Sequence, residues 1–170
     1  MARYSEINTE RLRLRPLVAD DAEAITNLIA DWDVVRMLAR APWPYGISDA
    51  RHYLARAADW PWEFAITGPQ LMGVVSMTGH LGCWIGKPYW GRGFMTEAAT
   101  AIVDAYFAGT TSKQIASGVF DGNEASLRVL AKLGFVEAGR SRQMCRSRNA
   151  EVDHIDMVLL RSAWKTKRAA

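Results

Sequence analysis

The sequence predicts an α+β (mixed α/β) fold built around one central mixed sheet of about seven strands, with an antiparallel N-terminal half and helices on both faces. Three observations predict it. The length of 170 residues suits one domain with a substantial core, so we expect a single domain over residues 1–170. Three short apolar segments follow one another between residues 62 and 86, as in an antiparallel meander. After Pro88, helical and strand-like patterns alternate, as in βαβ units.

The chain is expected to begin with a strand and a helix. Leu12 and Leu14 alternate with arginines in the segment ERLRLRPL, which is the period of a strand with one buried face. Asp20 is followed three residues later by Glu23, as in a capping box, and apolar residues then recur at helical spacing. We therefore expect one strand over the arginine-rich segment and a helix from about Asp20 to Ala30.

A loop and a second helix are expected before the meander. The segment APWPYGIS contains two prolines and a glycine, which favour a loop, and Ser48 at its end is a typical helix N-cap. We expect a helix from Ser48 to about Asp59. The meander then comprises strands near 62–67, 71–78 and 80–86, with the residues GPQ in the first turn.

The second half of the chain combines helices with strands. A long helix is expected after Pro88, because apolar residues recur at helical spacing along one side: Met95, Ala98, Ala99, Ile102, Val103, Tyr106 and Phe107. The further elements are a strand KQIASGVF, a helix from Glu124 to Leu133, and strands at about 135–140 and 152–160. Asn123 can cap that helix and Gly134 can end it as a C′ residue. We expect the basic tail WKTKRAA to be solvated.

The composition excludes several classes of protein. With 49% hydrophobic and 23% charged residues, the chain has the composition of a soluble globular protein, and no apolar run reaches the length of a membrane span. The first residues lack the apolar core of a secretory signal, so we expect a cytoplasmic protein whose Cys83 and Cys145 are reduced thiols. The histidines His52, His80 and His154 lack metal-ligand spacing, so no metal site is expected. A net charge of +3 is too small to indicate nucleic-acid binding.

The segment WGRGFMTEA places two glycines just before a predicted helix. A strand ending near Gly86, followed by this segment, brings unpaired backbone N–H groups and the positive end of a helix dipole to one point, which favours an anion. Gly91 and Gly93 let the backbone approach a pyrophosphate, and Arg92 adds a cationic donor. The simpler alternative is that both glycines only shape a tight turn.

A dinucleotide site of the Rossmann type is a second interpretation of these glycines. The residues GRGFMT nearly match the G-x-G-x-x-G pattern, and Asp121 ends the next strand, where a ribose-binding acid would lie. Thr96, however, replaces the third glycine, and antiparallel strands precede the motif. Too few βα units follow to complete a doubly wound sheet. The dinucleotide interpretation is therefore the weaker one.

A larger set of segments resembles the GNAT superfamily of N-acetyltransferases, in the branch of the ribosomal-protein N-terminal alanine acetyltransferases. These segments are TERLRLRPL, APWPYGISDA, CWIGKPYWGRGFMTEAATAIVDAYF, DGNEASLRVLAKLGF and DHIDMVLLRSAW, and they follow the family's order over nearly the whole chain. The resemblance implies the GNAT fold, with acetyl-CoA as co-substrate. The family's pyrophosphate loop, Q/R-x-x-G-x-G/A, falls on Trp90, Gly91, Arg92, Gly93, Phe94 and Met95, and Thr96 completes the expected anion site. Trp90 and Met95 depart from the motif.

The resemblance also implies how the rest of acetyl-CoA binds. The backbone of Trp84 and Ile85 should pair with the pantetheine arm where two central strands part, in the manner of an added strand. Asn123 and Ser126 should then face the thioester. A helix N-cap explains Asn123 equally well, and the two roles are compatible.

Acetyl transfer needs a proton to leave the acceptor amine and a thiolate, whose reference pKa is about 8.5, to depart. Many relatives protonate that thiolate with a tyrosine, whose position in the motif is Leu130 here. By the resemblance, Ser126, one helical turn earlier, is the expected substitute. A backbone N–H near Ile85 is the expected donor to the oxyanion.

The expected base is His80, which occupies a strand position where relatives often carry a glutamate. A neutral imidazole accepts a proton near pH 7, although a histidine that only fills a strand position is the alternative. His154 is the other candidate, as a base or as a contact of the acceptor. Trp43 and Tyr45 are expected to line the acceptor site, and packing alone would explain them equally well.

These features together predict an N-acetyltransferase, an enzyme that transfers acetyl from acetyl-CoA to a primary amine by direct attack in a ternary complex. The expected acceptor is a protein N-terminus, an amino acid or a small amine. Neither nucleic acid nor membrane is an expected partner, and a homodimer is left open. The alternative is a GNAT-like domain that binds CoA without turnover, which Leu130 and His80 in place of the family's catalytic side chains would fit.

Overall fold

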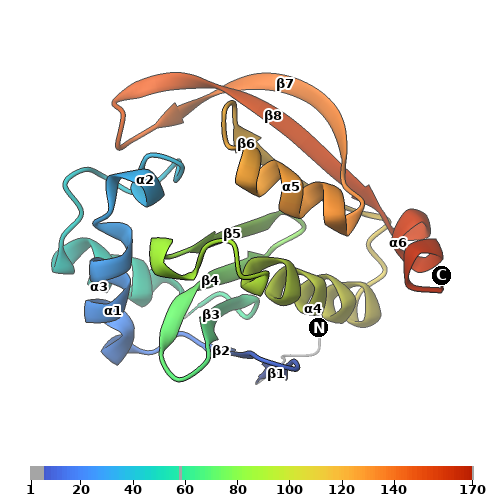
Figure 1. Ribbon diagram of the computed structural model, residues 1–170, viewed down its shortest axis with the longest axis horizontal. Coiled ribbons are helices and arrows are strands. Elements are labelled where there is room, and N and C mark those ends of the chain that lie inside the picture. Colours follow the sequence, from blue (N-terminus) through green and yellow to red (C-terminus); the bar gives the residue numbers. More distant parts are fainter. Residues whose placement is uncertain (1–5, 58, 170) are drawn as a thin grey trace.

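The computed structural model describes residues 6–57 and 59–169. Within them the elements are β1 (Ile7–Asn8), β2 (Arg13–Pro16), η1 (Ala19–Asp21), α1 (Ala22–Ile29), α2 (Trp32–Val35), α3 (Ile47–Ala57), β3 (Glu63–Thr67), β4 (Leu71–Met77), β5 (Leu81–Ile85), η2 (Lys87–Tyr89), α4 (Phe94–Gly109), β6 (Gln114–Phe120), α5 (Glu124–Leu133), β7 (Val136–Cys145), β8 (Ala150–Leu160) and α6 (Arg161–Ala169) (Figure 1). They form an antiparallel sheet β1-β2-β3-β4-β5 and a second antiparallel sheet β6-β8-β7. This mixed architecture confirms the predicted fold class.

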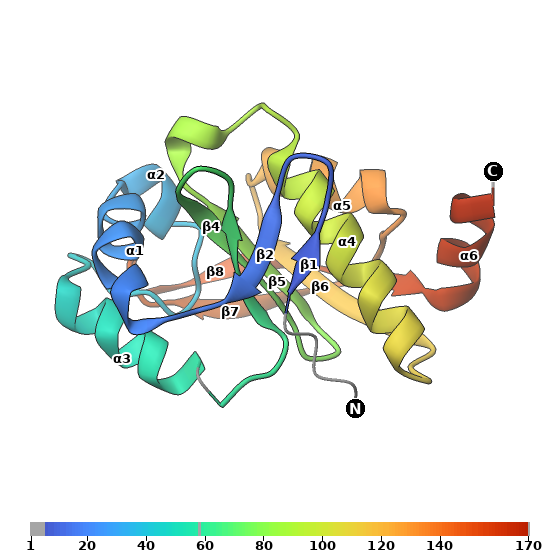
Figure 2. The ribbon, with the colours of Figure 1, turned by 90° about the horizontal axis from the view of Figure 1, so that it is seen from below.

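Helices cover both faces of the five-stranded sheet. Successive residues of a strand point to opposite faces, so Phe64 and Ile66 of β3 pack in one core with α4, whereas Ala65 packs in another with α1 and α3. Figure 2 shows α1 and α3 on one side of the strands and α4 on the other. No helix among the described residues is long and apolar enough to span a membrane.

The second sheet continues the larger of these cores. β8 lies between β6 and β7 and pairs with both, and β7 and β8 arch over α5 in Figure 1. Leu130 and Leu133 of α5 and Leu159 of β8 belong to the same buried cluster as Ile102 of α4 and Phe64 of β3. The two sheets therefore share one apolar core.

The two sheets meet at one point. An isolated parallel bridge joins His80 to Ala116, and next to it the Ser117 hydroxyl donates to the Leu81 carbonyl oxygen at 2.9 Å. Beyond this point β5 and β6 are not paired, so the sheet is divided where we expected one continuous sheet. The described strands contain no doubly wound parallel sheet, and the dinucleotide-binding interpretation is therefore wrong.

The predicted capping box of Asp20 and Glu23 is wrong. η1 leads directly into α1, whose N-cap is Asp21, and the Asp21 side chain makes no cap hydrogen bond to the helix. The Asp21 carboxylate instead accepts from the Val18 N–H at 2.9 Å and from the Arg15 guanidinium at 2.6 and 2.8 Å. A bidentate charged pair is stronger than a neutral cap, which explains why this carboxylate turns away from the helix.

The predicted N-cap at Ser48 is also wrong. α3 begins one residue earlier, at Ile47, and ends at Ala57, two residues before the predicted end. The side chain that satisfies the entry to this helix is Asp49, which accepts from the Gly46 N–H at 2.9 Å. The proline-rich segment before it is a loop, as predicted.

The C-terminal half agrees with the prediction except at its end. Asn123 Oδ1 accepts from the Ser126 N–H at 3.2 Å, and Gly134, with a φ of 94°, ends α5. β7 and β8 form a longer hairpin than predicted, with β7 reaching residue 145. The tail, predicted to be solvated, forms α6, in which Trp164 is 4% exposed and donates its indole N–H to Asp104 at 2.8 Å. The prediction is wrong for Trp164, whose partner lies far away in the sequence, whereas residues 165–169 are exposed as predicted.

Candidate active site

A cavity of about 930 Å³ opens where β5 and β6 part. At one end it is lined by Met95 of α4 and by Asn123 and Ser126 at the start of α5. At the other end it reaches the loop around residues 37–42, α3 and the β7–β8 hairpin. The volume is that of a site for a sizeable ligand, and the cavity joins segments from both sheets.

The glycine-rich loop before α4 presents unpaired backbone donors. In the described part of the chain, the N–H groups of residues 91–96 donate no hydrogen bond, and the next N–H, of Glu97, is bonded to the Gly93 carbonyl oxygen. Gly91 and Gly93 have φ values of 72° and 78°, which a residue with a side chain rarely adopts. A Cβ atom at Gly91 would meet no atom within 4 Å, so open space lies beside this backbone. Free N–H groups at the start of a 16-residue helix form an anion site.

Glu97, in the first turn of α4, carries a carboxylate that would repel an anion, and neighbouring donors balance its charge. Glu97 accepts from the Thr9 hydroxyl at 2.5 Å and from the backbone N–H and Nε of Arg11 at 2.9 and 2.7 Å. Partial burial acts to raise the pKa of the Glu97 carboxyl, but these hydrogen bonds and the Arg11 charge hold it below its usual range. Arg11 also donates to the Arg92 carbonyl oxygen at 3.1 Å, which ties the glycine-rich loop to the β1–β2 hairpin.

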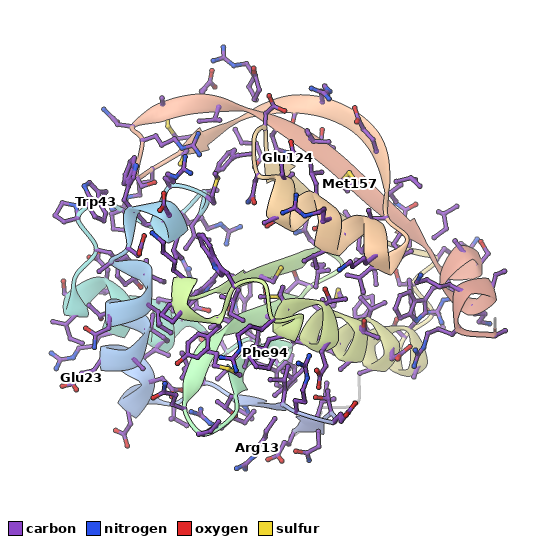
Figure 3. All side chains as sticks on the ribbon, viewed as in Figure 1. Arg13, Glu23, Trp43, Phe94, Glu124 and Met157 are labelled. Carbon is purple, nitrogen blue, oxygen red and sulfur yellow. The ribbon has the colours of Figure 1, made fainter. Side chains whose placement is uncertain are left out.

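Phe94 forms a platform for two cations beside this loop. The Arg11 and Arg92 guanidinium carbons both lie 4.8 Å from the centre of its ring. Figure 3 shows Phe94 beside the N-terminal end of α4. Both guanidinium groups therefore stay near the free N–H groups and favour a negatively charged ligand there.

The backbone of β5 presents alternate residues to the gap between the sheets. The Gly86 N–H donates to the Met72 carbonyl oxygen, which fixes the phase of the β4–β5 ladder. By the alternation of an antiparallel pair, Trp84 bonds to β4 and the backbone groups of Cys83 and Ile85 point away from it. The strand pairing expected for Trp84 and Ile85 is thus available at Ile85 and at Cys83.

Trp90 closes the loop that follows β5. Its indole N–H donates to the Ile85 carbonyl oxygen at 2.7 Å, while 43% of the residue remains exposed. This bond spans the turn between the end of β5 and the glycine-rich loop. The tryptophan that departs from the family motif therefore holds the loop against the strand with its side chain.

The thioester end predicted from the sequence is assembled at the start of α5. Ser126 and Asn123 are half-buried and line the cavity, and in the described residues the Ser126 hydroxyl has no hydrogen-bond partner. Leu130, one turn further, is 2% exposed and has no proton to give. Burial raises the pKa of the Cys83 thiol to about 11, so this cavity-lining cysteine stays protonated and is a weak nucleophile.

Both candidate bases line the cavity, but their environments differ. His80 lies at the bridge between the sheets with an exposed side chain, and its ring makes no hydrogen bond in the described residues. Surrounding protein atoms, and then the charges of His154 and Arg40, lower the pKa of the His80 imidazole, so it is neutral at pH 7. His154 is 8% exposed, and its Nδ1 lies 2.8 Å from the Asp156 carboxylate.

The two aromatic residues expected at the acceptor site lie differently. Tyr45 is buried and lines the cavity, and burial followed by the charge of Asp49 raises the pKa of its phenol to about 12. Trp43 is 45% exposed, lies at the edge of the molecule beside α2 in Figure 3, and packs edge-on against Trp32 at 5.2 Å between ring centres. Tyr45 therefore lines the cavity, whereas Trp43 is not among the lining residues.

Two polar pairs in this region were not predicted from the sequence. Tyr53 of α3 donates to Glu63 of β3 at 2.6 Å, and both line the cavity. Asp156 supports His154. The two residues of the first pair come from different elements, and no periodic pattern indicates them. The second pair has the i, i+2 spacing of one strand face, and that spacing was the available signal.

Comparisons with known proteins agree with this geometry. The family model described as an acetyltransferase (GNAT) domain matches residues 11–136. The uncharacterized N-acetyltransferase p20 of Bacillus licheniformis is 25% identical over 92% of this chain and 96% of its own length. The crystal structure of a GNAT-family acetyltransferase from Bacillus anthracis superposes with a TM-score of 0.79 at 21% identity, covering 91% of this chain and 98% of that one. A ribosomal-protein-S5-alanine acetyltransferase from Vibrio fischeri gives 0.78 at 21%, covering 94% and 98%.

Proposed function

The chain belongs to the acetyltransferase (GNAT) family and is an acetyl-CoA-dependent acyltransferase; from that premise we propose that it acetylates a primary amine by direct attack in a ternary complex. The observation that carries the proposal is one cavity that connects the start of α4 with two candidate bases. Met95, which follows the glycine-rich loop and its unpaired N–H groups, lines this cavity together with His80 and His154. Cofactor and acceptor can therefore meet in the same cavity.

The cofactor would bind through backbone groups more than through side chains. The N–H groups of residues 91–96 suit the pyrophosphate, and Arg92 adds charge beside them. The outward-facing backbone of Cys83 and Ile85 suits the amide groups of the pantetheine arm, which would lie in the gap like an added strand. Asn123 and Ser126 would then lie next to the thioester.

The transfer itself exchanges one bond for another. The amine nitrogen forms a bond to the thioester carbonyl carbon, and the carbon–sulfur bond breaks with its electron pair leaving on sulfur. A backbone N–H of β5 near Ile85 would stabilise the oxyanion, and the Ser126 hydroxyl would donate a hydrogen bond to the thiolate. The base that the sequence predicts is His80, which is neutral at pH 7, and His154 is its alternative. The raised pKa of the Cys83 thiol favours direct attack over an acetyl-cysteine intermediate.

The acceptor remains one of three classes: a protein N-terminus, an amino acid or a small amine. The ribosomal-protein-S5-alanine acetyltransferase supports the first class by its name, through likeness of fold alone. That a single domain over residues 1–170, in the cytoplasm and without a nucleic-acid or membrane partner, carries the activity stays a prediction, as does a homodimer.

Mass spectrometry tests the proposal. Purified protein is incubated with acetyl-CoA and a panel of N-terminal peptides, amino acids and small amines, and products are searched for the added acetyl mass. We expect at least one acceptor to be acetylated only when protein and acetyl-CoA are both present. If acetyl-CoA binds and no amine in any of the three classes is acetylated, the domain binds CoA without turnover and the proposal fails.

A further inference from the structure

We infer that His154, held by Asp156, is the base that removes the proton from the acceptor amine, with Asp156 as its positioning residue. The inference rests on the proposed acetyl transfer. In the segment EVDHIDM these two residues are two positions apart on β8, so their side chains share one face of the sheet. Asp156 pairs with a glycine on each neighbouring strand, Gly118 on β6 and Gly139 on β7, which leaves room on that face.

The carboxylate fixes which imidazole nitrogen carries the proton. His154 Nδ1 lies 2.8 Å from Asp156 Oδ1, and an ionised carboxylate only accepts, so Nδ1 donates and Nε2 keeps its lone pair. Ser141 on β7 donates its hydroxyl to the same Oδ1 at 3.0 Å and steadies the carboxylate. The Gln143 amide is 3.3 Å from Nδ1, a longer contact than that with the carboxylate. A base held in the correct tautomer by a carboxylate is an established arrangement for proton removal.

The imidazole ring of His154 lies over β6 in the lining of the cavity. A Cβ atom at Gly118 would overlap the Cε1 atom of His154 and come within 2.8 Å of its Nε2, so the ring lies directly over β6. Gly118 and His154 both line the cavity. Phe120, which like Gly118 belongs to β6, packs edge-on against the imidazole at 5.9 Å between ring centres. The imidazole is thus fixed by contacts from all three strands of its sheet.

The rival imidazole lacks such support. His80 is exposed, and within the described residues its ring has no hydrogen-bond partner. The titratable and charged groups around His154 are Asp156 on its own strand and, on the other side, His80 and Arg40. The neighbouring strands β6 and β7 contribute uncharged side chains: Phe120, Ser141 and Gln143. Asp156 is the one carboxylate in this set, and it contacts His154.

The proton balance of the step is simple. The acceptor arrives as an ammonium, and His154 Nε2 takes one proton to give the neutral amine. Nitrogen then bonds to the acetyl carbon, the carbon–sulfur bond breaks, and sulfur leaves as a thiolate that is protonated to CoA thiol. The second proton of the nitrogen passes to that thiolate as the amide forms, and the imidazolium returns its own proton to water, so the step yields amide, CoA thiol and one proton in solution.

Three variants test the assignment with the acceptor found by mass spectrometry. His154→Gln should lower kcat/KM by about 10²–10⁴-fold, the usual contribution of a general base. It should also remove the wild-type acid limb of the pH profile, so that the rate follows the free-amine fraction alone. Asp156→Asn should lower kcat with little change in the Kd of acetyl-CoA, and Asp156→Glu should restore part of it. Asp153→Asn, at an exposed carboxylate of the same strand, is the control and should leave the profile unchanged.

The outcomes separate this inference from the function on which it rests. Failure of the wild-type protein to acetylate any amine would refute the proposed transfer. With an active wild type, loss of the acid limb in His80→Gln and its persistence in His154→Gln would assign the base to His80 and overturn the inference. An unchanged pH profile and rate in Asp156→Asn would overturn the role of the carboxylate. Melting temperatures and calorimetric titration with acetyl-CoA identify any variant that has misfolded. If His154→Gln has misfolded, the rate and pH profile of Asp156→Asn test the assignment in its place.

Discussion

Replacing Gly93 by alanine should weaken acetyl-CoA binding in addition to a modest loss of fold stability. Gly93 has a φ of 78° at the N-terminus of α4, and the new Cβ would meet Arg11 Nη2 at 3.4 Å, an ordinary contact. The cost to folding is therefore backbone strain of about 1–2 kcal/mol, which lowers the melting temperature by roughly 2–8 °C for a chain of this size. Losing one backbone hydrogen bond to a charged phosphate costs about 1.5–3 kcal/mol, or roughly 10- to 150-fold in Kd.

Gly134→Ala is the matched control. Gly134 has a φ of 94° at the end of α5, and its Cβ would meet Leu159 Cδ1 at 3.6 Å, so the strain is similar. It lies at the opposite end of that helix from Asn123 and Ser126. Scanning fluorimetry should give similar losses of melting temperature for the two variants. Isothermal titration calorimetry should show weakened acetyl-CoA binding in Gly93→Ala alone. Equal affinities in the two variants would refute the assignment of this loop to the pyrophosphate.

Three further predictions concern the same cavity. Ser126→Ala should lower kcat by about 10-fold or more while the Kd of acetyl-CoA stays within about twofold, because the hydroxyl acts on the developing thiolate. If steady-state kinetics show an unchanged kcat while chemistry is rate-limiting, Ser126 has no role in the mechanism. Trp90→Phe removes the indole bond to the Ile85 carbonyl oxygen, worth about 1 kcal/mol, and should raise the Kd several-fold by calorimetry; an unchanged Kd would mean that the loop is held without it. The lowered pKa of Glu97 gives stability that is fully present above its unfolded pKa of about 4.3 and is lost as the pH falls through the folded value. Glu97→Gln should therefore flatten the dependence of the melting temperature on pH in that acid range. An unaltered slope would contradict the stabilising contacts of Glu97 with Thr9 and Arg11.

Local signals in the sequence predicted local structure well. The alternation around Leu12 and Leu14 and the caps of α5 at Asn123 and Gly134 depend on residues within one turn or strand, and the structure has them as expected. β1 and α2, with two and four residues, are too short to give a periodic pattern and were missed.

Long-range partners explain the errors. The sequence did not indicate Asp21 as the start of α1, because its carboxylate binds Arg15 of the preceding strand and makes no cap hydrogen bond to the helix. Trp164 is buried through Asp104, a partner 60 residues away, so the tail appeared solvated. In the candidate site, the glycine-rich loop was recognisable from its spacing, whereas the support of His154 requires Gly118 from another strand and could not be read from one segment.

The most direct test of the account is a titration of the isotope-labelled protein with acetyl-CoA, followed by backbone amide NMR. The account predicts that the amide signals of residues 91–96, together with those of Cys83 and Ile85, shift most, because these N–H groups would donate to the pyrophosphate and the pantetheine arm. NADH at the same concentration should leave them in place. Saturable binding of acetyl-CoA that shifts other amides and leaves these eight unchanged would contradict the account.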